Sequence, residues 1–419
     1  MVSSIRIIYC ILCGAVVAWN LHPFLINGSY SRTDHEWNNP GIPSAINDDA
    51  QAMGLIENST NTNAIPIIDI LSTGSMNRPD YQVAQEAFLR EHPSVRHYFA
   101  MTELNDTESE CHSQLNWTQV VKISRKCRSL QGKLRAPFLA RLVQGFVRVR
   151  FLQKKANPMG WMCAQKRPLT SLWQILQGYD SHDFPDYLFL MDDDTWIQMD
   201  TLVPTLTLQY PSHLPYFIAG CPIRFKRDHN FSFPFGGYAM IFTKAALYRW
   251  RQPLKGCHPF LPESSPTDDA VDQNDFIPYV CNRLHRHHQI GERMSPHLFS
   301  QQQLQRDMTV ADILYSYVHR ANYTNVEKWD GIGYCLHSDW ALGYFASEYR
   351  ISMNGQLQGF HNSSMSKGVR TGECLHRMET ECYSNATICH YMTPKGMRER
   401  MKNVTRTINT TSTIPSTDG

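Results

Sequence analysis

Three consecutive aspartates, Asp192, Asp193 and Asp194, directly follow the apolar run YLFLM (187–191). Like charges at adjacent positions repel and raise one another's pKa, so the cluster lowers stability unless a cation or hydrogen-bond donors offset it. Two interpretations follow. Either the aspartates form a solvated acidic turn at the end of a strand, or they bind a hard divalent cation such as Mg²⁺ or Mn²⁺, which favours carboxylate oxygens.

The elements that precede the aspartates place them at one edge of a sheet. The apolar run IPIIDIL (65–71) predicts a buried strand, and HYFAMT (97–102) predicts a second one. Between them a helix is expected from Pro79, with apolar residues at i, i+3 and i+7. Strand, helix and strand at this spacing form a βαβ unit, whose parallel strands bind ligands at their carboxyl ends. The amphipathic segment LTSLWQIL (169–176) predicts a further helix before the aspartate strand, so the fold class is α/β.

Later segments continue this pattern. YFIAGC (216–221) and YAMIFT (238–243) predict strands, and a helix is expected near 276–287. The segment FGGY (235–238) contains two glycines, which either allow a ligand close to the backbone or form a plain turn.

The N-terminus resembles a targeting segment. Arg6 precedes the apolar stretch IIYCILCGAVVAW (7–19), which is short for a membrane span. We interpret residues 1–26 as a signal peptide or a signal anchor, the latter making a single-pass type II membrane protein. In both cases the rest of the chain enters the secretory lumen.

Composition divides the remaining chain into three parts. Residues 27–63 are rich in Asn, Ser, Asp and Gly and predict a flexible stem. We expect residues 64–395 to form a single compact domain of alternating strands and helices. Residues 396–419 are rich in Thr, Ser and Asn and predict a disordered tail.

Glycosylation signals and cysteines also indicate a luminal protein. Ten of the twelve cysteines lie beyond Cys13, an even number that favours disulfides in an oxidising compartment. Ten N-x-S/T sequons occur, at Asn27, Asn58, Asn105, Asn116, Asn230, Asn322, Asn362, Asn385, Asn403 and Asn409.

The net charge is only +2 and there is no long basic run, so no nucleic-acid partner is expected.

Two unlike chemistries use an apolar strand followed by Asp-x-Asp. Phosphohydrolases of the haloacid dehalogenase type place a nucleophilic aspartate first and a Thr or Val where this chain has Trp196. Nucleotide-sugar glycosyltransferases of the GT-A type hold Mn²⁺ with the carboxylates, and the cation offsets the charge that develops on the leaving diphosphate. Trp196 disfavours the phosphohydrolase interpretation.

The segments DYLFLMDDDTWI and FPFGGYAMIFTKAAL resemble the fringe and core-1 galactosyltransferase-like family of inverting glycosyltransferases. IPIIDILSTGSMNRP and CAQKRPLTSLWQIL are also similar to that family's approach to the aspartates, so the resemblance covers roughly residues 64–310. It implies a GT-A-type, Rossmann-like mixed sheet flanked by helices. It also implies a UDP-sugar donor, Mn²⁺ and a location in the Golgi membrane.

The resemblance further implies roles for individual residues. Asp194 would ligate the metal directly, while Asp192 and Asp193 would contact the ribose or a metal-bound water. Gly236 and Gly237 would line the donor and acceptor cleft. A family histidine completes the metal shell, and His297 in SPHLFSQQQLQ is its candidate here, the alternative being a structural histidine. Arg78 either contacts the nucleotide or is a solvated arginine at a helix start.

Inverting transfer also needs a carboxylate base that takes the proton of the acceptor hydroxyl. Candidates lie in SSPTDDAVDQNDFIPYVCNRL. Asp275 is favoured because an apolar residue follows at once and begins a helical pattern, and a helix start keeps a carboxylate ionised. Asp269 is the alternative, since Asp268-Asp269 resembles the acidic pair of the family.

The sequence therefore predicts an inverting, Mn²⁺-dependent transferase that moves a hexose or N-acetylhexosamine from a UDP-sugar to a glycan or glycoprotein acceptor. Two alternatives stay open, namely a metal-dependent phosphohydrolase and a glycan-binding protein that kept the fold without catalysis. The transferred sugar and the acceptor are not readable from the sequence, because their pockets are built from scattered residues.

Overall fold

The computed structural model describes residues 65–102, 115–133, 152–180, 183–219, 222–225, 228–234, 236–252, 309, 338–339, 342, 352–353 and 387–411. The expected targeting segment (1–26) and stem (27–63) lie outside these residues. Within the described part, no helix combines the length and the hydropathy that a membrane crossing needs.

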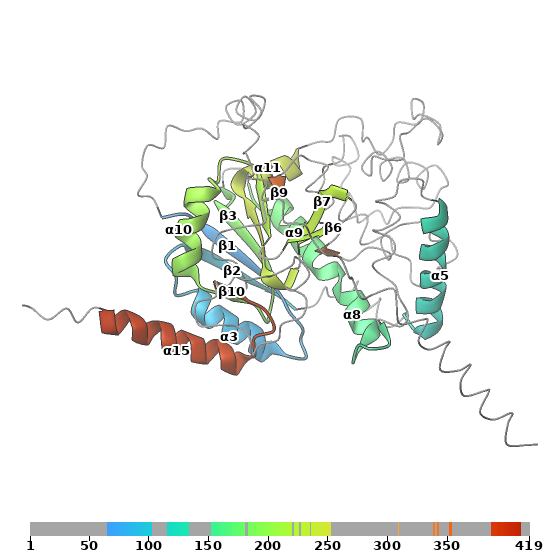
Figure 1. Ribbon diagram of the computed structural model, residues 1–419, viewed down its shortest axis with the longest axis horizontal. Coiled ribbons are helices and arrows are strands. Elements are labelled where there is room, and N and C mark those ends of the chain that lie inside the picture. The colour runs from blue at the N-terminus through green and yellow to red at the C-terminus, as the bar shows by residue number, and fades with distance from the viewer. Residues whose placement is uncertain are drawn as a thin grey trace, which may run out of the picture. The chain divides into compact units, whose positions relative to one another are not determined.

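The centre of the fold is a mixed six-stranded sheet (Figure 1). Strand β1 pairs in parallel with β2 on one side and β3 on the other, and β8 then pairs antiparallel with both β3 and β5. The outermost pair, β5 and β9, is parallel. In sheet order the strands are β2 (Val95–Met101), β1 (Ile68–Thr73), β3 (Tyr187–Asp192), β8 (Met240–Thr243), β5 (Tyr216–Ala219) and β9 (Ser352–Met353).

Helices pack on both faces of this sheet, which gives the predicted α/β class. The helices of the described residues are α3 (Pro79–Leu89), α5 (Trp117–Lys133), α8 (Pro158–Ala164), α9 (Lys166–Gly178), α10 (Met199–Gln209), α11 (Lys244–Arg251) and α15 (Pro394–Thr411), with a 3₁₀ turn η2 at Gly236–Tyr238. Of these, α3, α9, α10 and α11 cover the sheet.

One face of the sheet packs against α3 and α10. Alternate strand residues point to this face, as the two-residue period of a strand requires. Ile70, Phe189 and Ile241 join Leu89 of α3 and Leu202 of α10 in a single buried cluster. The core on this side therefore lies directly beneath the strands that lead to the aspartates.

The opposite face packs against α9 and α11. The ring of Trp250 from α11 lies 5.1 Å from that of Phe242 and 6.4 Å from that of Phe217, measured between centroids. The strand β3 is buried along all five residues of its apolar run because both of its faces are covered.

A buried ion pair ties the β1–β2 edge to the end of α9. Asp69 has no exposed surface and accepts two hydrogen bonds from the guanidinium of Arg96, at 3.1 and 2.6 Å. The hydroxyl of Tyr179 donates a third hydrogen bond to Asp69 at 2.6 Å. These donors compensate for the removal of the carboxylate from water.

The predicted βαβ unit is confirmed. β1 and β2 are parallel, and α3 connects them with Pro79 at its first turn. The predicted helix at 169–176 lies within α9, and the strands predicted around 216–221 and 238–243 form β5 and β8. The helix expected near 276–287 lies outside the described residues.

Two short sheets accompany the main one. β6 (Pro222–Phe225) and β7 (Asp228–Pro234) form an antiparallel pair. β4 (Trp196–Ile197), just after the aspartates, pairs antiparallel with β10 (Ile388–Cys389) from near the C-terminus. The second pairing brings a segment from about 190 residues further along the chain to the aspartate turn.

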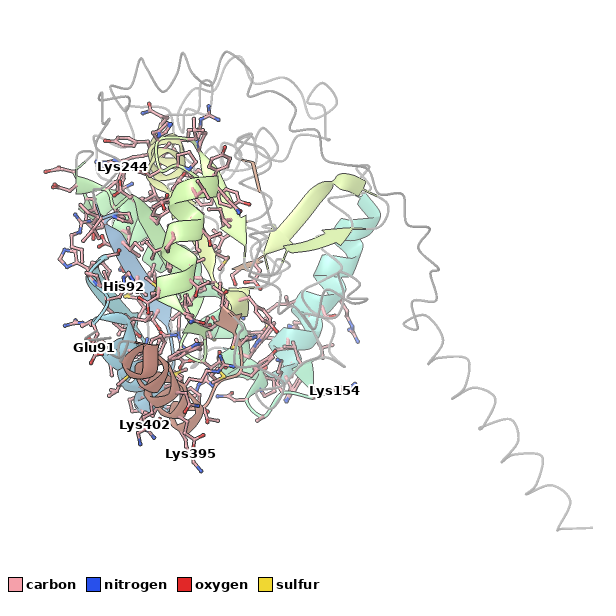
Figure 2. All side chains as sticks on the ribbon, turned by 60° about the vertical axis from the view of Figure 1, so that its left-hand side comes forward. Glu91, His92, Lys154, Lys244, Lys395 and Lys402 are labelled. Carbon is pink, nitrogen blue, oxygen red and sulfur yellow. The ribbon has the colours of Figure 1, made fainter. Side chains whose placement is uncertain are left out.

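The predicted disordered tail is wrong for residues 396–411, because these residues belong to α15. Met397 is fully buried and packs with Ala84 of α3 and with Trp196, which the Thr- and Asn-rich composition does not reveal. Lys395 and Lys402 project from the outer side of this helix, away from α3 (Figure 2).

Candidate metal centre

Hydrogen bonds from β1 hold the start of the aspartate turn. Thr73, the last residue of β1, is the register partner of Asp192. The Thr73 carbonyl accepts a hydrogen bond from the backbone N–H of Asp193 at 3.0 Å. The Thr73 hydroxyl donates to Oδ1 of Asp192 at 3.2 Å, and also lies 3.2 Å from the carbonyl of Met191. The turn therefore begins at the carboxyl edge of two parallel strands.

Gln85 of α3 fixes the backbone of the turn by hydrogen bonds. Its side-chain amide donates to the carbonyls of Asp192 and Thr195, at 2.9 and 2.8 Å, and its own oxygen accepts from the hydroxyl of Tyr98 at 2.8 Å. Gln85 is fully buried, so these hydrogen bonds satisfy carbonyls that water does not reach. A helix residue thereby sets the path of the backbone that carries the three carboxylates.

His390 reaches the turn through β10. Cys389 pairs with Trp196 in the ladder, and the backbone N–H of Met392 donates to the carbonyl of Asp194 at 2.9 Å. Cys389 is disulfide-bonded, as is Cys163 at the end of α8. The histidine is thus anchored on both sides along the chain.

The imidazole of His390 is enclosed by its neighbours. Its centroid lies 5.3 Å from the ring of Tyr238 in an edge-on arrangement and 3.7 Å from the ring of Tyr391, which stacks on it. Gly237 lies so close that an added Cβ would overlap the imidazole. The carbonyl of Gly237 accepts a hydrogen bond from the hydroxyl of Thr195 at 2.9 Å, which fixes that approach.

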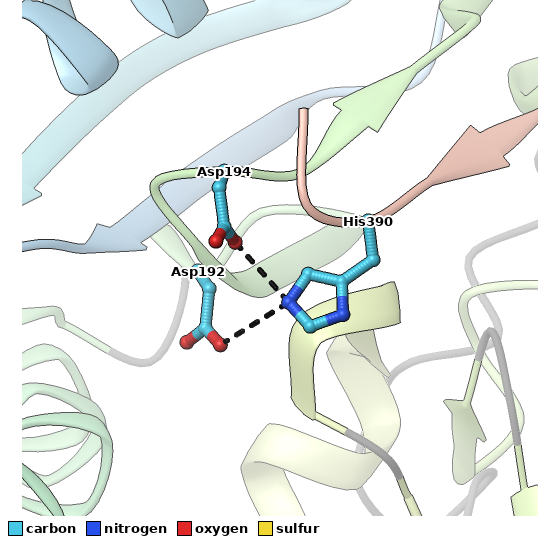
Figure 3. Close-up of side chains that lie close together, drawn as sticks. All are labelled: Asp192, Asp194 and His390. Atoms are coloured by element: carbon cyan, nitrogen blue, oxygen red, sulfur yellow. Dashed lines mark ion pairs between the residues drawn. The ribbon is translucent and has the colours of Figure 1, made fainter. Parts of the chain in front are cut away.

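Asp192, Asp194 and His390 form a group that could hold a metal ion (Figure 3). The imidazole Nε2 lies 3.2 Å from Oδ1 of Asp194 and 3.9 Å from Oδ2 of Asp192, and one ligand atom from each residue falls within 4.8 Å of the others. A cation with bonds of about 2.1 Å holds neighbouring ligand atoms roughly 3 Å apart and opposite ones roughly 4.2 Å apart. The two separations between the imidazole and the carboxylates, 3.2 and 3.9 Å, fall within this range.

Hydrogen bonds from the described residues do not satisfy every carboxylate oxygen of this group. Oδ1 of Asp194 is buried and accepts no hydrogen bond from a described residue, although His390 Nε2 is only 3.2 Å away, so that contact lacks the direction of a hydrogen bond. Buried carboxylate oxygens without donors are costly, and a cation offsets that cost. Carboxylates suit Mg²⁺ and Mn²⁺ and imidazole suits Zn²⁺ and Fe²⁺, so this set of ligands fits a divalent cation without selecting one.

Burial and mutual repulsion shift the pKa values of the aspartates apart. Partial burial, with 45% of the side chain still exposed, and the charge of Asp194 raise the pKa of Asp192 to about 6, from an ordinary value of 3.8. Removal from water also raises the pKa of Asp193 to about 7, although the guanidinium of Arg78 opposes this shift. Burial acts in the same direction on Asp194, but His390 and Arg78 outweigh it and lower its pKa.

Arg78 compensates for Asp193 rather than extending freely into solvent. Its Nη2 donates to Oδ1 of Asp193 at 2.6 Å, and its Nη1 lies 3.8 Å from Oδ2 of Asp194. The guanidinium also lies 4.8 Å from the ring centroid of Tyr81. Its side chain is 44% exposed, so part of the guanidinium is accessible to a ligand.

A fourth carboxylate, that of Asp339, belongs to the surroundings of the site. Asp339 is buried, and its negative charge raises the pKa of Asp192 in addition to burial and the charge of Asp194, while His390 opposes this shift. The preceding Ser338 lies with its hydroxyl 3.0 Å from Oε1 of Gln165 and 3.3 Å from Oδ1 of Asp339. These contacts connect Asp339 to the junction of α8 and α9.

The structure brings together part of the residue set predicted from sequence. Asp192, Asp193, Asp194, Gly237 and Arg78 converge on the turn, and Gly236 opens η2 beside them. The predicted third metal ligand, His297, and the predicted bases Asp269 and Asp275 lie outside the described residues.

Sequence reasoning missed His390 and Asp339. His390 stands in the segment ICHYM, one of eighteen histidines in the chain, and only the β4–β10 pairing places it at the aspartates. Asp339 stands in HSDWALGYF, where no neighbouring acidic residue drew attention to it.

Comparison with known proteins adds no family assignment. No protein-family model matches the chain, and no similar curated protein was found. The interpretation of the site therefore depends on its own residues and geometry.

Replacement of Gly237 by alanine should weaken cation binding. The added methyl group would overlap the His390 ring and displace it from the carboxylates, so we expect the Kd for Mn²⁺ to rise about tenfold or more, measured by titration calorimetry. Gly178→Ala is the matched control, because a Cβ there meets no atom within 4 Å. Unchanged Mn²⁺ affinity in Gly237→Ala would contradict the assignment of His390 as a ligand.

Mn²⁺ should stabilise the protein more at about pH 7.5 than at about pH 5. Because the pKa values of Asp192 and Asp193 are raised in the folded protein, the folded state binds protons more tightly than the unfolded state. The stability that this proton binding contributes is fully present below about pH 4 and is lost as the pH rises through about 6 to 7. Without metal, the melting temperature should therefore fall across this window because repulsion grows, and Mn²⁺ should reverse that fall. Thermal unfolding with EDTA or Mn²⁺ at both pH values measures the effect, and Asp192→Asn should reduce it. An equal Mn²⁺ effect at the two pH values would contradict the proposed role of the carboxylates.

Proposed function

We propose that this chain is an inverting glycosyltransferase that uses Mn²⁺ and transfers a hexose or N-acetylhexosamine from a UDP-sugar to a glycan or glycoprotein acceptor. The observation that carries the proposal is the Asp192–Asp194–His390 group at the carboxyl edge of β1 and β3. A ligand site at that edge is the usual arrangement in open α/β sheets. The mixed sheet flanked by helices is compatible with a GT-A-type fold in one catalytic domain.

The residues of the group suit a nucleotide diphosphate. Asp192, Asp194 and His390 would hold the cation, and the bound cation would offset the charge that develops on the leaving diphosphate. Arg78 adds a cationic side chain whose guanidinium is partly exposed beside Asp193. A guanidinium there binds phosphate or ribose oxygens through directed hydrogen bonds.

The acceptor hydroxyl also needs a base, and Asp339 is a candidate in addition to Asp269 and Asp275. Asp339 is a buried carboxylate whose charge raises the pKa of Asp192, and it is not a member of the cation group itself. A base for inverting transfer must stand apart from the leaving diphosphate, on the side from which the acceptor attacks.

The two alternative functions fit the site less well. A phosphohydrolase of the haloacid dehalogenase type carries a small residue at the position of Trp196, whereas Trp196 is buried with its ring 4.1 Å from that of Phe88. A protein that only bound glycans would gain nothing from three repelling carboxylates in one turn. The proposed location is the Golgi lumen, with the acceptor among glycans or glycoproteins there.

Release of UDP by the full-length chain tests the function. The chain is expressed in a secretory host, purified and incubated with Mn²⁺, a glycan acceptor mixture and each of UDP-glucose, UDP-galactose, UDP-N-acetylglucosamine and UDP-N-acetylgalactosamine. We expect Mn²⁺-dependent UDP release with at least one donor, and a loss of about 100-fold in Asp194→Asn because a metal ligand is removed.

Asp200→Asn is the control for the same chemical change, since Asp200 is 67% exposed and lies on α10. Release of inorganic phosphate from phosphomonoesters, with no UDP released from any donor, would favour the phosphohydrolase. Binding of glycans without release of either product would favour the non-catalytic alternative.

Three variants identify the base. We expect Asp339→Asn to lower turnover by about 100-fold or more while the Kd values for Mn²⁺ and UDP stay within about twofold, as loss of a general base requires. Asp269→Asn and Asp275→Asn are measured in parallel. Wild-type turnover in Asp339→Asn, together with an inactive Asp275→Asn or Asp269→Asn, would assign the base to the segment predicted from sequence.

A further inference from the structure

Tyr391 is the one large exposed hydrophobic residue that the described part of the chain places at the cation group. Tyr391 is 44% exposed, whereas the neighbouring His390, Asp194 and Tyr238 are all buried. It follows the metal-ligand candidate His390 directly in the chain. An exposed aromatic ring at the rim of a polar site is a surface that a ligand can cover.

The backbone of Tyr391 is held in an unfavourable conformation. Its φ of 61° lies in the left-handed region, which bulky side chains rarely adopt. Among the described residues only Ala239, which follows η2 at the same site, shares a positive φ without being glycine. Glycine would relieve this strain, so a tyrosine here indicates that the ring itself has a role.

One face of the ring is occupied and the other is not covered by any ring of the described residues. The imidazole of His390 stacks on it at 3.7 Å between centroids, with 26° between the planes. The phenol hydroxyl forms no hydrogen bond with a described residue. Tyr391 thus offers an aromatic face together with a polar hydroxyl at the ring edge.

The ring lies among the carboxylates that the proposed reaction uses. After burial, the charges of Asp194, Asp192 and Asp339 are the causes that raise the pKa of the Tyr391 phenol. The charges of all three carboxylates therefore act at the ring, and its stacking on His390 places it beside the cation group. In the proposed function the sugar passes between the cation group and Asp339.

We infer that Tyr391 binds a pyranose ring, with the apolar C–H face of the sugar packed against the exposed face of the tyrosine. This inference rests on the proposed function. Pyranoses present an apolar face as well as hydroxyls, and an amphipathic aromatic ring buries such a face while it keeps a polar edge for the hydroxyls. The sugar is either that of the donor or that of the acceptor, since both meet between the cation group and Asp339.

The alternative role for Tyr391 is to support the imidazole of His390 by stacking. The two roles affect different measurements. If Tyr391 supports His390, removal of its ring changes the affinity for Mn²⁺. If Tyr391 binds the sugar, removal of its ring changes the affinity for the pyranose and leaves Mn²⁺ and UDP binding unchanged.

The test compares Tyr391→Ala with Tyr391→Phe in the full-length chain. The ligands are Mn²⁺ alone, UDP with Mn²⁺ and the UDP-sugar that the wild-type chain uses with Mn²⁺, all measured by calorimetry, and the KM for the acceptor is measured by UDP release. In Tyr391→Ala we expect the Kd values for Mn²⁺ and UDP to stay within about twofold. Either the Kd of the UDP-sugar or the KM of the acceptor should rise about tenfold, which identifies the sugar that is bound. Tyr391→Phe keeps the ring and should retain wild-type values for the stacked sugar.

Two results in Tyr391→Ala would overturn the inference while the proposed function stands. One is an unchanged Kd for the UDP-sugar together with an unchanged KM for the acceptor. The other is a loss of Mn²⁺ affinity that accounts for the whole defect, as expected of a support for His390. Failure of the proposed function is seen in the wild-type chain itself, which would then bind no UDP-sugar, and that result overturns both.

Discussion

Repulsion among Asp192, Asp193 and Asp194 is the constraint to which the surrounding structure responds. Each carboxylate has a different partner. Asp193 is paired with Arg78 and Asp194 is close to His390. Asp192 is affected by the charges of Asp194 and Asp339 and, among the described residues, receives a hydrogen bond only from Thr73. The group as a whole keeps an excess of negative charge that the described side chains do not neutralise. A divalent cation is the ligand that such an arrangement favours most strongly.

The backbone of the turn is fixed without the use of these carboxylates. Hydrogen bonds reach it from β1 through Thr73, from α3 through Gln85 and from the segment after β10 through Met392. Because backbone groups and an amide side chain supply this rigidity, the carboxylate oxygens stay available for a cation. Ligands held in place before binding lose little conformational freedom when the cation arrives, and this favours affinity.

Local patterns in the sequence were sufficient for one half of the site. The βαβ unit and the aspartate strand follow from continuous apolar runs and a helical period, and both are decided within about ten residues. His390 was not predictable in this way, because its position depends on a two-residue pairing with β4 that no periodicity records. Asp339 was missed for the same reason, as its short buried segment joins the site through Ser338 and Gln165. The helix α15 was overlooked because its composition is polar, while Met397 and Met401, which belong to or pack against the core cluster among its described side chains, are only a single i, i+4 pair.

The C-terminal segment is therefore part of the machinery of the site. β10 is too short to hold His390 in place by its own ladder, so the position of the imidazole depends on what packs beside it. Met392 and Met397 bury against Trp196 and Ala84, directly next to the turn that carries the aspartates. This apolar cluster anchors the histidine, and it also excludes water from one side of the carboxylates, which strengthens their attraction to a cation. Packing of α15 would therefore be coupled to the binding of a cation at the turn, since both involve the same short stretch from Cys389 to Met397.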